Sequence, residues 1–161
     1  MSLWHFSEDP SLERFVPRDD KVWAIDERHA WLYWFPRDCP RACFWAVDST
    51  SDEDVERWLD GDSTCRVAVI EGTWLERMRA VRLYAYRMPN EPFDVVQDGR
   101  FYIASTTVDA IERVEVGDLI ARHAAEGIEL RIAPALYPLW GKVTETTLDY
   151  SGIRLRNAAH A

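Results

Sequence analysis

Residues 81–88 read Val-Arg-Leu-Tyr-Ala-Tyr-Arg-Met, a stretch in which apolar and polar side chains take turns. Leu83 and Ala85 fall on one face of an extended chain, because side chains in a strand point alternately to either side. Tyr84 and Tyr86 fall on the other face. The alternation predicts a strand that is buried on its aliphatic face and half-exposed on its tyrosine face.

The other expected elements are short and do not alternate regularly between strand and helix. Regular alternation would favour a parallel, Rossmann-like sheet, and the seven scattered glycines form no phosphate-binding loop. We therefore expect an α+β fold with curved, mostly antiparallel sheets and a few short helices, folded as a single domain over residues 1–161. Further strands are expected at 3–7, 22–25, 43–47, 66–71, 101–105, 111–116 and 128–132, and helices at 27–35, 53–59 and 119–125.

The composition is that of a folded, acidic chain. Nineteen basic residues stand against 28 acidic ones, which gives a net charge of −9, and 47% of the residues are hydrophobic. This proportion of apolar side chains is enough to form a hydrophobic core, and the net negative charge argues against nucleic acid as a partner. No apolar run approaches the ~20 residues that span a bilayer, and the first residues lack the apolar stretch of a signal peptide. We expect no membrane association.

The cysteines indicate a reducing compartment. Cys39, Cys43 and Cys65 are odd in number, which argues against a disulfide framework and favours the cytoplasm. The spacing of Cys39 and Cys43 is not that of a redox or zinc-binding pair. We therefore expect buried, unreactive cysteines and no metal site.

The first expected strand carries a candidate binding pair. Alternation places His5 and Ser7 on one face, opposite Trp4 and Phe6. A histidine and a hydroxyl on one face can hold the hydroxyls of a ribose or the amide of a base. The alternative is a histidine that packs and bonds only to the backbone, which is the commoner outcome for a single histidine.

Aromatic and arginine side chains gather in the next segment. Residues 23–45 are dense in Trp, Tyr and Phe, which can stack on a flat ring or form a core. Two prolines fix a loop that would present Arg37 and Arg41 as guanidinium forks for phosphate or carboxylate. An internal ion pair with an acid such as Asp38 is the alternative.

Three residues in the last part of the chain are further candidates for a functional site. Arg154 and Arg156 would lie on one strand face and join Ser7, Arg37 and Arg41 in an anion site. Glu129 lies in an apolar strand, where a carboxylate is either paired with an arginine or catalytic.

Several stretches of the chain together carry a resemblance to known sequences. They are His5-Phe6-Ser7-Glu8-Asp9-Pro10, Phe15-Val16-Pro17-Arg18, Val22-Trp23-Ala24-Ile25, Tyr33-Trp34-Phe35-Pro36-Arg37-Asp38-Cys39-Pro40-Arg41, Ile128-Glu129-Leu130-Arg131 and Tyr150-Ser151-Gly152-Ile153-Arg154-Leu155-Arg156-Asn157-Ala158. On these residues the chain resembles, nearly end to end, a family of small bacterial proteins of unknown function. The resemblance implies no activity.

A second, more distant resemblance is to a fold that is found in enzymes. A strand ending in His with a nearby hydroxyl, a second strand and then a helix bearing Tyr is similar to the entry half of the ADP-ribosyltransferase-like fold. That fold includes the poly-ADP-ribose polymerases and the RNA 2′-phosphotransferases. In its His-Tyr-Glu members, the His holds the ribose and nicotinamide end of NAD, the Tyr stacks on nicotinamide, and a late-strand Glu orients the acceptor.

The resemblance implies His5 and Tyr33 for the first two catalytic roles. Arg100 or Phe101 stands where the Glu is expected, so Glu129 is the candidate for the third. The resulting hypothesis is a cytoplasmic protein that binds a nucleotide-like or phosphorylated ligand and has transferase ancestry. Nothing else in the sequence calls for a cofactor besides the NAD that the resemblance implies. The alternative is a non-catalytic interaction module whose aromatic and arginine surface docks a protein, a second copy included.

Overall fold

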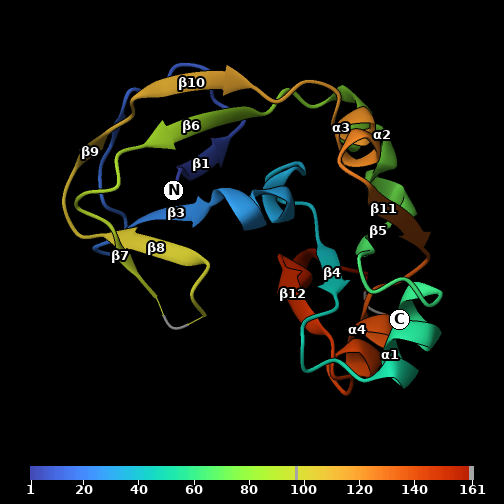
Figure 1. The fold of residues 1–161 in the computed structure, drawn as a ribbon. Helices are drawn as coiled ribbons and strands as arrows, with labels where there is room; N and C mark the ends of the chain where they lie inside the picture. The colour runs from blue at the N-terminus through green and yellow to red at the C-terminus, as the bar shows by residue number, and fades with distance from the viewer. Residues whose placement is uncertain (97, 160–161) are drawn as a thin grey trace. The chain divides into compact units, whose positions relative to one another are not determined.

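The computed structural model describes residues 1–96 and 98–159 and contains short strands and helices (Figure 1). The strands in chain order are β1 (Leu3–Ser7), β2 (Arg14–Phe15), β3 (Val22–Asp26), β4 (Arg41–Trp45), β5 (Arg66–Glu71), β6 (Tyr84–Met88), β7 (Asp94–Val95), β8 (Phe101–Ala104), β9 (Val108–Asp109), β10 (Glu112–Glu115), β11 (Ile128–Ala133) and β12 (Asp149–Ile153). The α-helices are α1 (Asp52–Leu59), α2 (Leu75–Ala80), α3 (Leu119–Ala125) and α4 (Tyr137–Val143), and the 3-10 helices are η1 (Glu27–Tyr33), η2 (Gly72–Trp74) and η3 (Leu155–Asn157).

The described residues form two compact units, each made of two chain segments. Unit 1 contains Met1–Arg37 and Val81–Gly117, and unit 2 contains Asp38–Ala80 and the described residues from Asp118 onward. The single domain over residues 1–161 stays a prediction. Within the described ranges, no helix combines the length and the apolar composition needed to cross a membrane.

Unit 1 is built on an antiparallel sheet with the strand order β10-β6-β1-β3-β8-β7, accompanied by the short β2–β9 pair. Apolar side chains from one face of the sheet meet side chains from β2 and β9. This cluster contains Leu3, Phe15, Val22, Ala24, Tyr86, Met88, Ala104 and Val108.

Strand β6 differs from its prediction in two respects. It begins at Tyr84 rather than at residue 81, and although Tyr84 is half-buried as expected, Tyr86 on the same face is fully buried. Phe15 from β2 lies against the Tyr86 ring, with the ring centroids 5.4 Å apart and the rings edge to face. The β2–β9 pair therefore covers a face that the alternation alone assigns to solvent.

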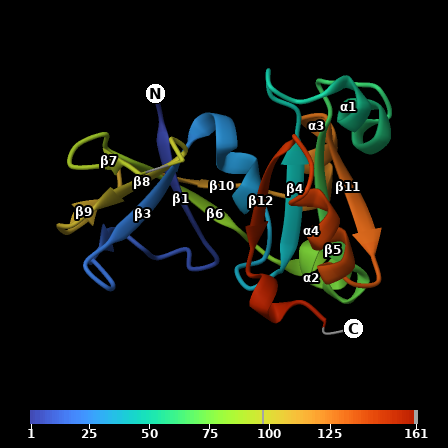
Figure 2. The same ribbon diagram turned by 90° about the horizontal axis from the view of Figure 1, so that it is seen from below.

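Unit 2 contains a four-stranded sheet with the order β11-β5-β4-β12, whose strands lie side by side in Figure 2. β11 runs parallel to β5, and the other neighbours are antiparallel. Its core gathers around Phe44, Val67, Val69 and Leu59, with Trp58 edge to face against Phe44. The prediction of an α+β fold with mostly antiparallel sheets and short helices is confirmed by the two units.

Local sequence signals explain where the helices begin and end. The side chain of Asp26 accepts a hydrogen bond from the His29 N–H and so caps η1. Asp118 caps α3 in the same way through Ala121, and Gly127, with φ at +70°, follows its end.

Candidate functional site

His5 lies in β1 and is tied to the neighbouring strand by its side chain. The β1–β3 register ends at the pair Trp4 and Ile25, just before His5. Here the His5 side chain forms a hydrogen bond to β3, with Nδ1 at 2.8 Å from the carbonyl oxygen of Trp23. Because a carbonyl only accepts, Nδ1 carries the proton and donates it, which leaves Nε2 as a hydrogen-bond acceptor.

The surroundings of His5 keep its ring neutral. Burial has the largest effect on the pKa of His5 and lowers it, and the positive charges of Arg37 and Arg18 lower it further. The bond to the Trp23 carbonyl opposes these effects without reversing them. The Phe15 ring covers one side of the imidazole, with centroids 4.7 Å apart.

Ser7 and Arg37 belong to unit 1, as His5 does. Ser7 and His5 share a face of β1, as predicted, since they pair with Tyr84 and Tyr86 two residues apart on β6. The Ser7 hydroxyl accepts a hydrogen bond from the Asp9 N–H at 3.1 Å. The backbone N–H of Arg37 donates to the Glu8 carboxylate at 3.2 Å, and the Arg37 side chain is exposed.

Tyr33, the last residue of η1, contacts the opposite face of the sheet. Its ring stacks on Phe6 at 6.4 Å and meets Phe101 edge to face at 6.0 Å. Phe101 in turn meets Trp23, which is 46% exposed. Because Phe6 and His5 alternate along β1, Tyr33 and His5 lie on different faces of the sheet. We refer to Phe6, Trp23, Tyr33 and Phe101 as the aromatic cluster.

Arg41 and Glu129 belong to unit 2. Arg41 is the first residue of β4 and is 2% exposed, so the prediction that a loop presents it on the surface is wrong. Its Nη1 donates to the Cys39 carbonyl at 3.0 Å. Glu129 accepts a hydrogen bond from Arg131 Nε at 2.8 Å, and this bond is the largest cause of its lowered pKa.

The C-terminal arginines do not share a strand face. Arg154 follows the end of β12 in the left-handed region with φ at 57°, and Arg156 lies in η3. The prediction of a shared strand face is therefore wrong, because the chain leaves the strand at Ile153 and turns into a 3-10 helix.

Two of the three cysteines are buried as expected, and Cys65 is not. Cys39 and Cys43 are free and buried, and desolvation raises the pKa of each thiol to about 12. Cys65 is partly exposed, also free, and has a raised pKa because of burial and the nearby Glu129 charge. High thiol pKa values make all three poor nucleophiles at neutral pH.

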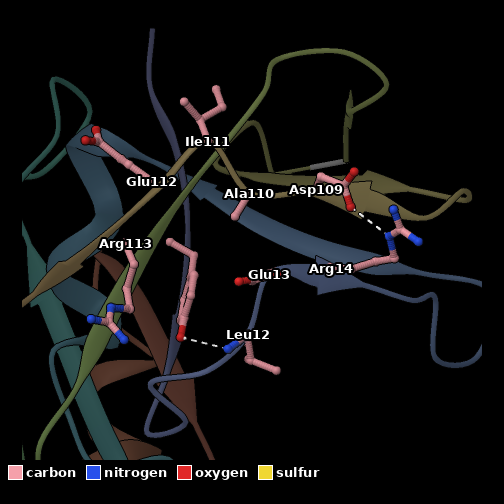
Figure 3. Close-up of a pocket in the computed structure, with 9 residues that line it drawn as sticks. Leu12, Glu13, Arg14, Asp109, Ala110, Ile111, Glu112 and Arg113 are labelled. Carbon is pink, nitrogen blue, oxygen red and sulfur yellow. Dashed lines mark hydrogen bonds and ion pairs between the residues drawn. The ribbon is translucent and has the colours of Figure 1, made fainter.

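A pocket of about 740 Å³ lies in unit 1 (Figure 3). The Tyr86 hydroxyl lies in its wall, donates to the Asp9 carbonyl and accepts from the Leu12 N–H at 3.2 Å. These bonds hold the loop that precedes β2. The lining residues are Leu12, Glu13, Arg14, Tyr86, Asp109, Ala110, Ile111, Glu112 and Arg113.

The charges of this pocket largely compensate one another. Arg14 Nε lies 2.9 Å from Asp109 Oδ1, and Arg87 Nε lies 2.6 Å from Glu112 Oε1. The Arg113 guanidinium donates to the Pro10 carbonyl and lies over the Tyr84 ring, 5.2 Å from its centroid. The pocket therefore favours neither an anion nor a cation.

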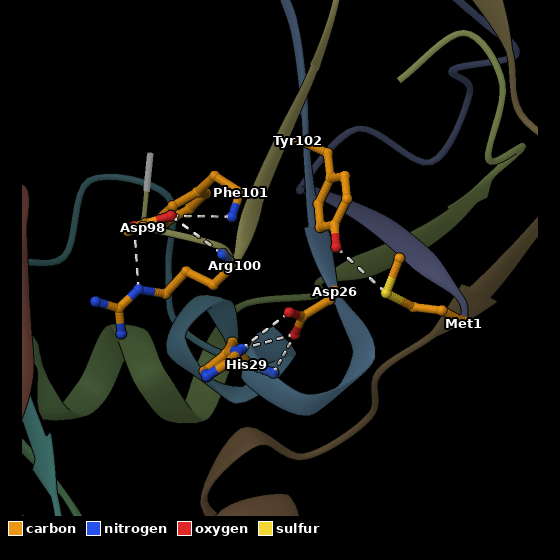
Figure 4. A network of polar contacts seen from close by, with 7 residues as sticks. All are labelled: Met1, Asp26, His29, Asp98, Arg100, Phe101 and Tyr102. Atoms are coloured by element: carbon orange, nitrogen blue, oxygen red, sulfur yellow. Dashed lines mark hydrogen bonds and ion pairs between the residues drawn. The ribbon is translucent and has the colours of Figure 1, made fainter. Parts of the chain in front are cut away.

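A polar network around the start of η1 was not predicted as a site (Figure 4). The buried Asp26 carboxylate accepts from His29 Nδ1 at 2.8 and 3.0 Å in addition to capping the helix. The backbone of Arg100 accepts from the Asp26 N–H, and its Nε bonds to Asp98 at 3.1 Å. The spacing of Asp26 and His29 was the available signal, since a cap residue and its third successor meet. Within the described ranges, no group of three or more His, Cys, Asp or Glu side chains could hold a metal ion.

Comparisons with known proteins identify a family without an assigned activity. A family model described as "Family of unknown function (DUF6886)" matches residues 4–158. No curated protein and no solved structure matches the chain. The expected resemblance to an uncharacterised family is thereby confirmed.

Proposed function

Because the chain belongs to DUF6886, a family of unknown function, we propose a function from its geometry: unit 1 binds a phosphorylated or nucleotide-like ligand at the end of β1. The observation that carries the proposal is the fixed orientation of His5. Its Nδ1–H is committed to the Trp23 carbonyl, and burial with two nearby arginines favours the neutral ring. Nε2 is then a hydrogen-bond acceptor suited to a hydroxyl group such as that of a ribose.

Positive charge near His5 supports an anionic ligand. Arg18 and Arg37 both act on His5 electrostatically, and both side chains are exposed. Guanidinium groups bind phosphate oxygens in pairs of hydrogen bonds, so an anion between them would relieve the repulsion. Ser7, on the same face as His5, adds a hydroxyl whose proton is available to a ligand oxygen.

Transferase chemistry is an extension of this proposal that rests on the resemblance alone. In that version NAD is the ligand in a bacterial cytoplasm, and His5 holds its ribose. Binding is the better-supported part, because His5 and Tyr33 contact different faces of the sheet. Arg41, Arg154 and Arg156 lie in unit 2, so the ligand site proposed for unit 1 does not depend on them.

Thermal unfolding with ADP-ribose, NAD, nucleotides, phosphate and sulfate tests the proposal. A ligand at a hundredfold excess over its dissociation constant adds about 2.7 kcal/mol of stability, which is several degrees for a chain of this length. We expect a shift with ADP-ribose or NAD. A shift with phosphate alone would indicate an anion site formed by the arginines, without a role for His5. No shift with any compound would contradict ligand binding.

His5→Asn is the informative variant. The Asn amide nitrogen can replace Nδ1 as the donor to the Trp23 carbonyl, but the variant lacks Nε2. We expect a folded protein without the ligand-induced shift. His29→Asn is the matched control, since it also keeps a donor and lies in η1; it should retain the shift.

The aromatic cluster supports a second candidate, a protein-interaction module. Trp23 is 46% exposed although its ring meets Phe101, and Lys21 lies over it at 5.6 Å. Exposed tryptophans are typical of the centres of protein interfaces. Trp23→Ala should then abolish the capture of a partner protein without altering the ligand-induced shift in unfolding temperature. Unchanged capture would exclude the aromatic cluster as the interface.

A further inference from the structure

Strand β10 forms one edge of the unit 1 sheet. The strand order places β10 beside β6 only, and all four of its residues are exposed. Two apolar side chains lie on this edge, Ile111 at 52% and Val114 at 45% exposure. An edge of this kind carries backbone N–H and C=O groups that can pair with another strand.

The hydrogen bonds to β6 show which β10 residues face outward. The Val116 N–H donates to the Leu83 carbonyl at 2.9 Å, and the register continues from there through Val114 and Glu112. In an antiparallel pair, hydrogen-bonded positions alternate with positions that point away. Arg113 and Glu115 therefore direct their backbone groups away from β6, toward the open edge.

We propose that β10 pairs antiparallel with β10 of a second copy of this chain and joins two unit 1 sheets across a twofold axis at Val114. An antiparallel pairing of identical edges is isologous, so each contact occurs twice. The proposal is independent of the ligand site at His5.

The charges of β10 select this register among the alternatives. Backbone pairing through the outward positions can place Arg113 opposite Arg113, Glu115 opposite Glu115, or Arg113 opposite Glu115. Like charges directly opposite each other destabilise a sheet, which disfavours the first two registers. The third creates two Arg113–Glu115 pairs on one face and places Val114 against its own copy on the other.

Side-chain geometry within the chain is compatible with these pairs. Arg113 and Glu115 lie on the same face, since they are opposite Tyr86 and Tyr84. The Arg113 guanidinium uses Nη1 for the Pro10 carbonyl, and its other N–H groups have no hydrogen-bond partner in the described ranges. The other sheet edge of unit 1 is β7, which has only two residues.

Charge-reversal variants test the interface by sedimentation from low to high micromolar concentration. The wild-type chain should dimerise, whereas Arg113→Glu and Glu115→Arg should each be monomeric. An equimolar mixture of the two variants should dimerise again, because each cross-pair then joins opposite charges. A monomeric wild type, or a mixture that stays monomeric although both variants are folded by circular dichroism, would overturn the proposal.

A cysteine pair tests the register independently of charge. Residues opposite each other at a non-hydrogen-bonded position lie about 4.5 Å apart between Cα atoms, which suits a disulfide. Val114→Cys, in a Cys65→Ser background, should therefore give a covalent dimer on mild oxidation. Glu112→Cys is the control, because its copies would lie roughly 13 Å apart along the strand direction. Equal cross-linking of both variants would contradict the register.

Discussion

Both units bury polar side chains, but they use them differently. In unit 2 the buried carboxylate of Glu71 accepts from the Leu136 N–H at 3.1 Å and from the Ala159 N–H at 2.9 and 3.0 Å. In unit 1 the polar atoms of His5 and Tyr86 hold strands and loops beside exposed arginines and a pocket. The buried carboxylate of Glu71 therefore bonds to the backbone of its own unit, whereas the buried hydroxyl of Tyr86 in unit 1 borders a pocket.

The largest effect is expected in unit 2, from Glu71→Ala. The substitution leaves the buried N–H of Leu136 without an acceptor, which costs about 1–3 kcal/mol, and it also removes the bond that the carboxylate makes to the N–H of the exposed Ala159. We expect a loss of about 3 kcal/mol in the free energy of unfolding, measured with urea. Glu71→Gln keeps one carbonyl oxygen and should lose less than half as much. Equal losses from both variants would show that charge, not acceptance, stabilises this position.

A smaller effect is expected in unit 1, from Tyr86→Phe. The ring stays against Phe15, but the hydroxyl that joins the Asp9 carbonyl to the Leu12 N–H is lost. We expect a loss of about 1–2 kcal/mol, because the loop groups can turn to water. Hydrogen exchange should show faster exchange at Leu12 while β6 stays protected. A loss as large as that of Glu71→Ala would remove the distinction between the two units.

The sequence predicted the fold class because short-range patterns carry it. Alternation in residues 81–88 and the cap residues Asp26 and Asp118 act within a few residues of the elements that they specify. The burial of Tyr86 could not be read from this pattern, because Phe15 covers it from a strand 71 positions away in the chain. Alternation identifies two faces but not what covers each of them.

The candidate site was predictable only where neighbours along the chain decide it. The shared face of His5 and Ser7 follows from one strand and is observed. Arg41 shows the opposite case: the prolines around it suggested an exposed loop, but β4 begins at Arg41 and buries it. The Trp23 carbonyl that fixes His5 lies 18 positions away, and no local signal identifies it. Tertiary contacts therefore decide which candidate side chains face solvent.

The smallest effect is a pH dependence that both units share. Burial is the largest cause that lowers the pKa of His5 in unit 1 and of His123 in unit 2. Both groups have an ordinary value of 6.5 in the unfolded chain, so the unfolded state binds protons first as the pH falls below 6.5. Stability should be complete above that pH and decrease below it, before carboxylates begin to protonate near about pH 4.

His5→Asn and His123→Asn separate the two contributions, since each removes a titrating ring and keeps an amide donor for the Trp23 or Leu119 carbonyl. Urea unfolding at a series of pH values below 6.5 should show a reduced slope for each variant and the smallest slope for the double variant. The effects should add, because the two histidines belong to different compact units. If His5→Asn alone removed the pH dependence of stability, the free-energy cost of protonation would come from His5 in unit 1. That outcome would agree with the proposal that His5 Nε2 stays unprotonated to accept a hydrogen bond from a ligand. If stability rose on acidification in the wild type, neither ring would be neutral in the folded chain, and the acceptor role assigned to His5 Nε2 would fail with it.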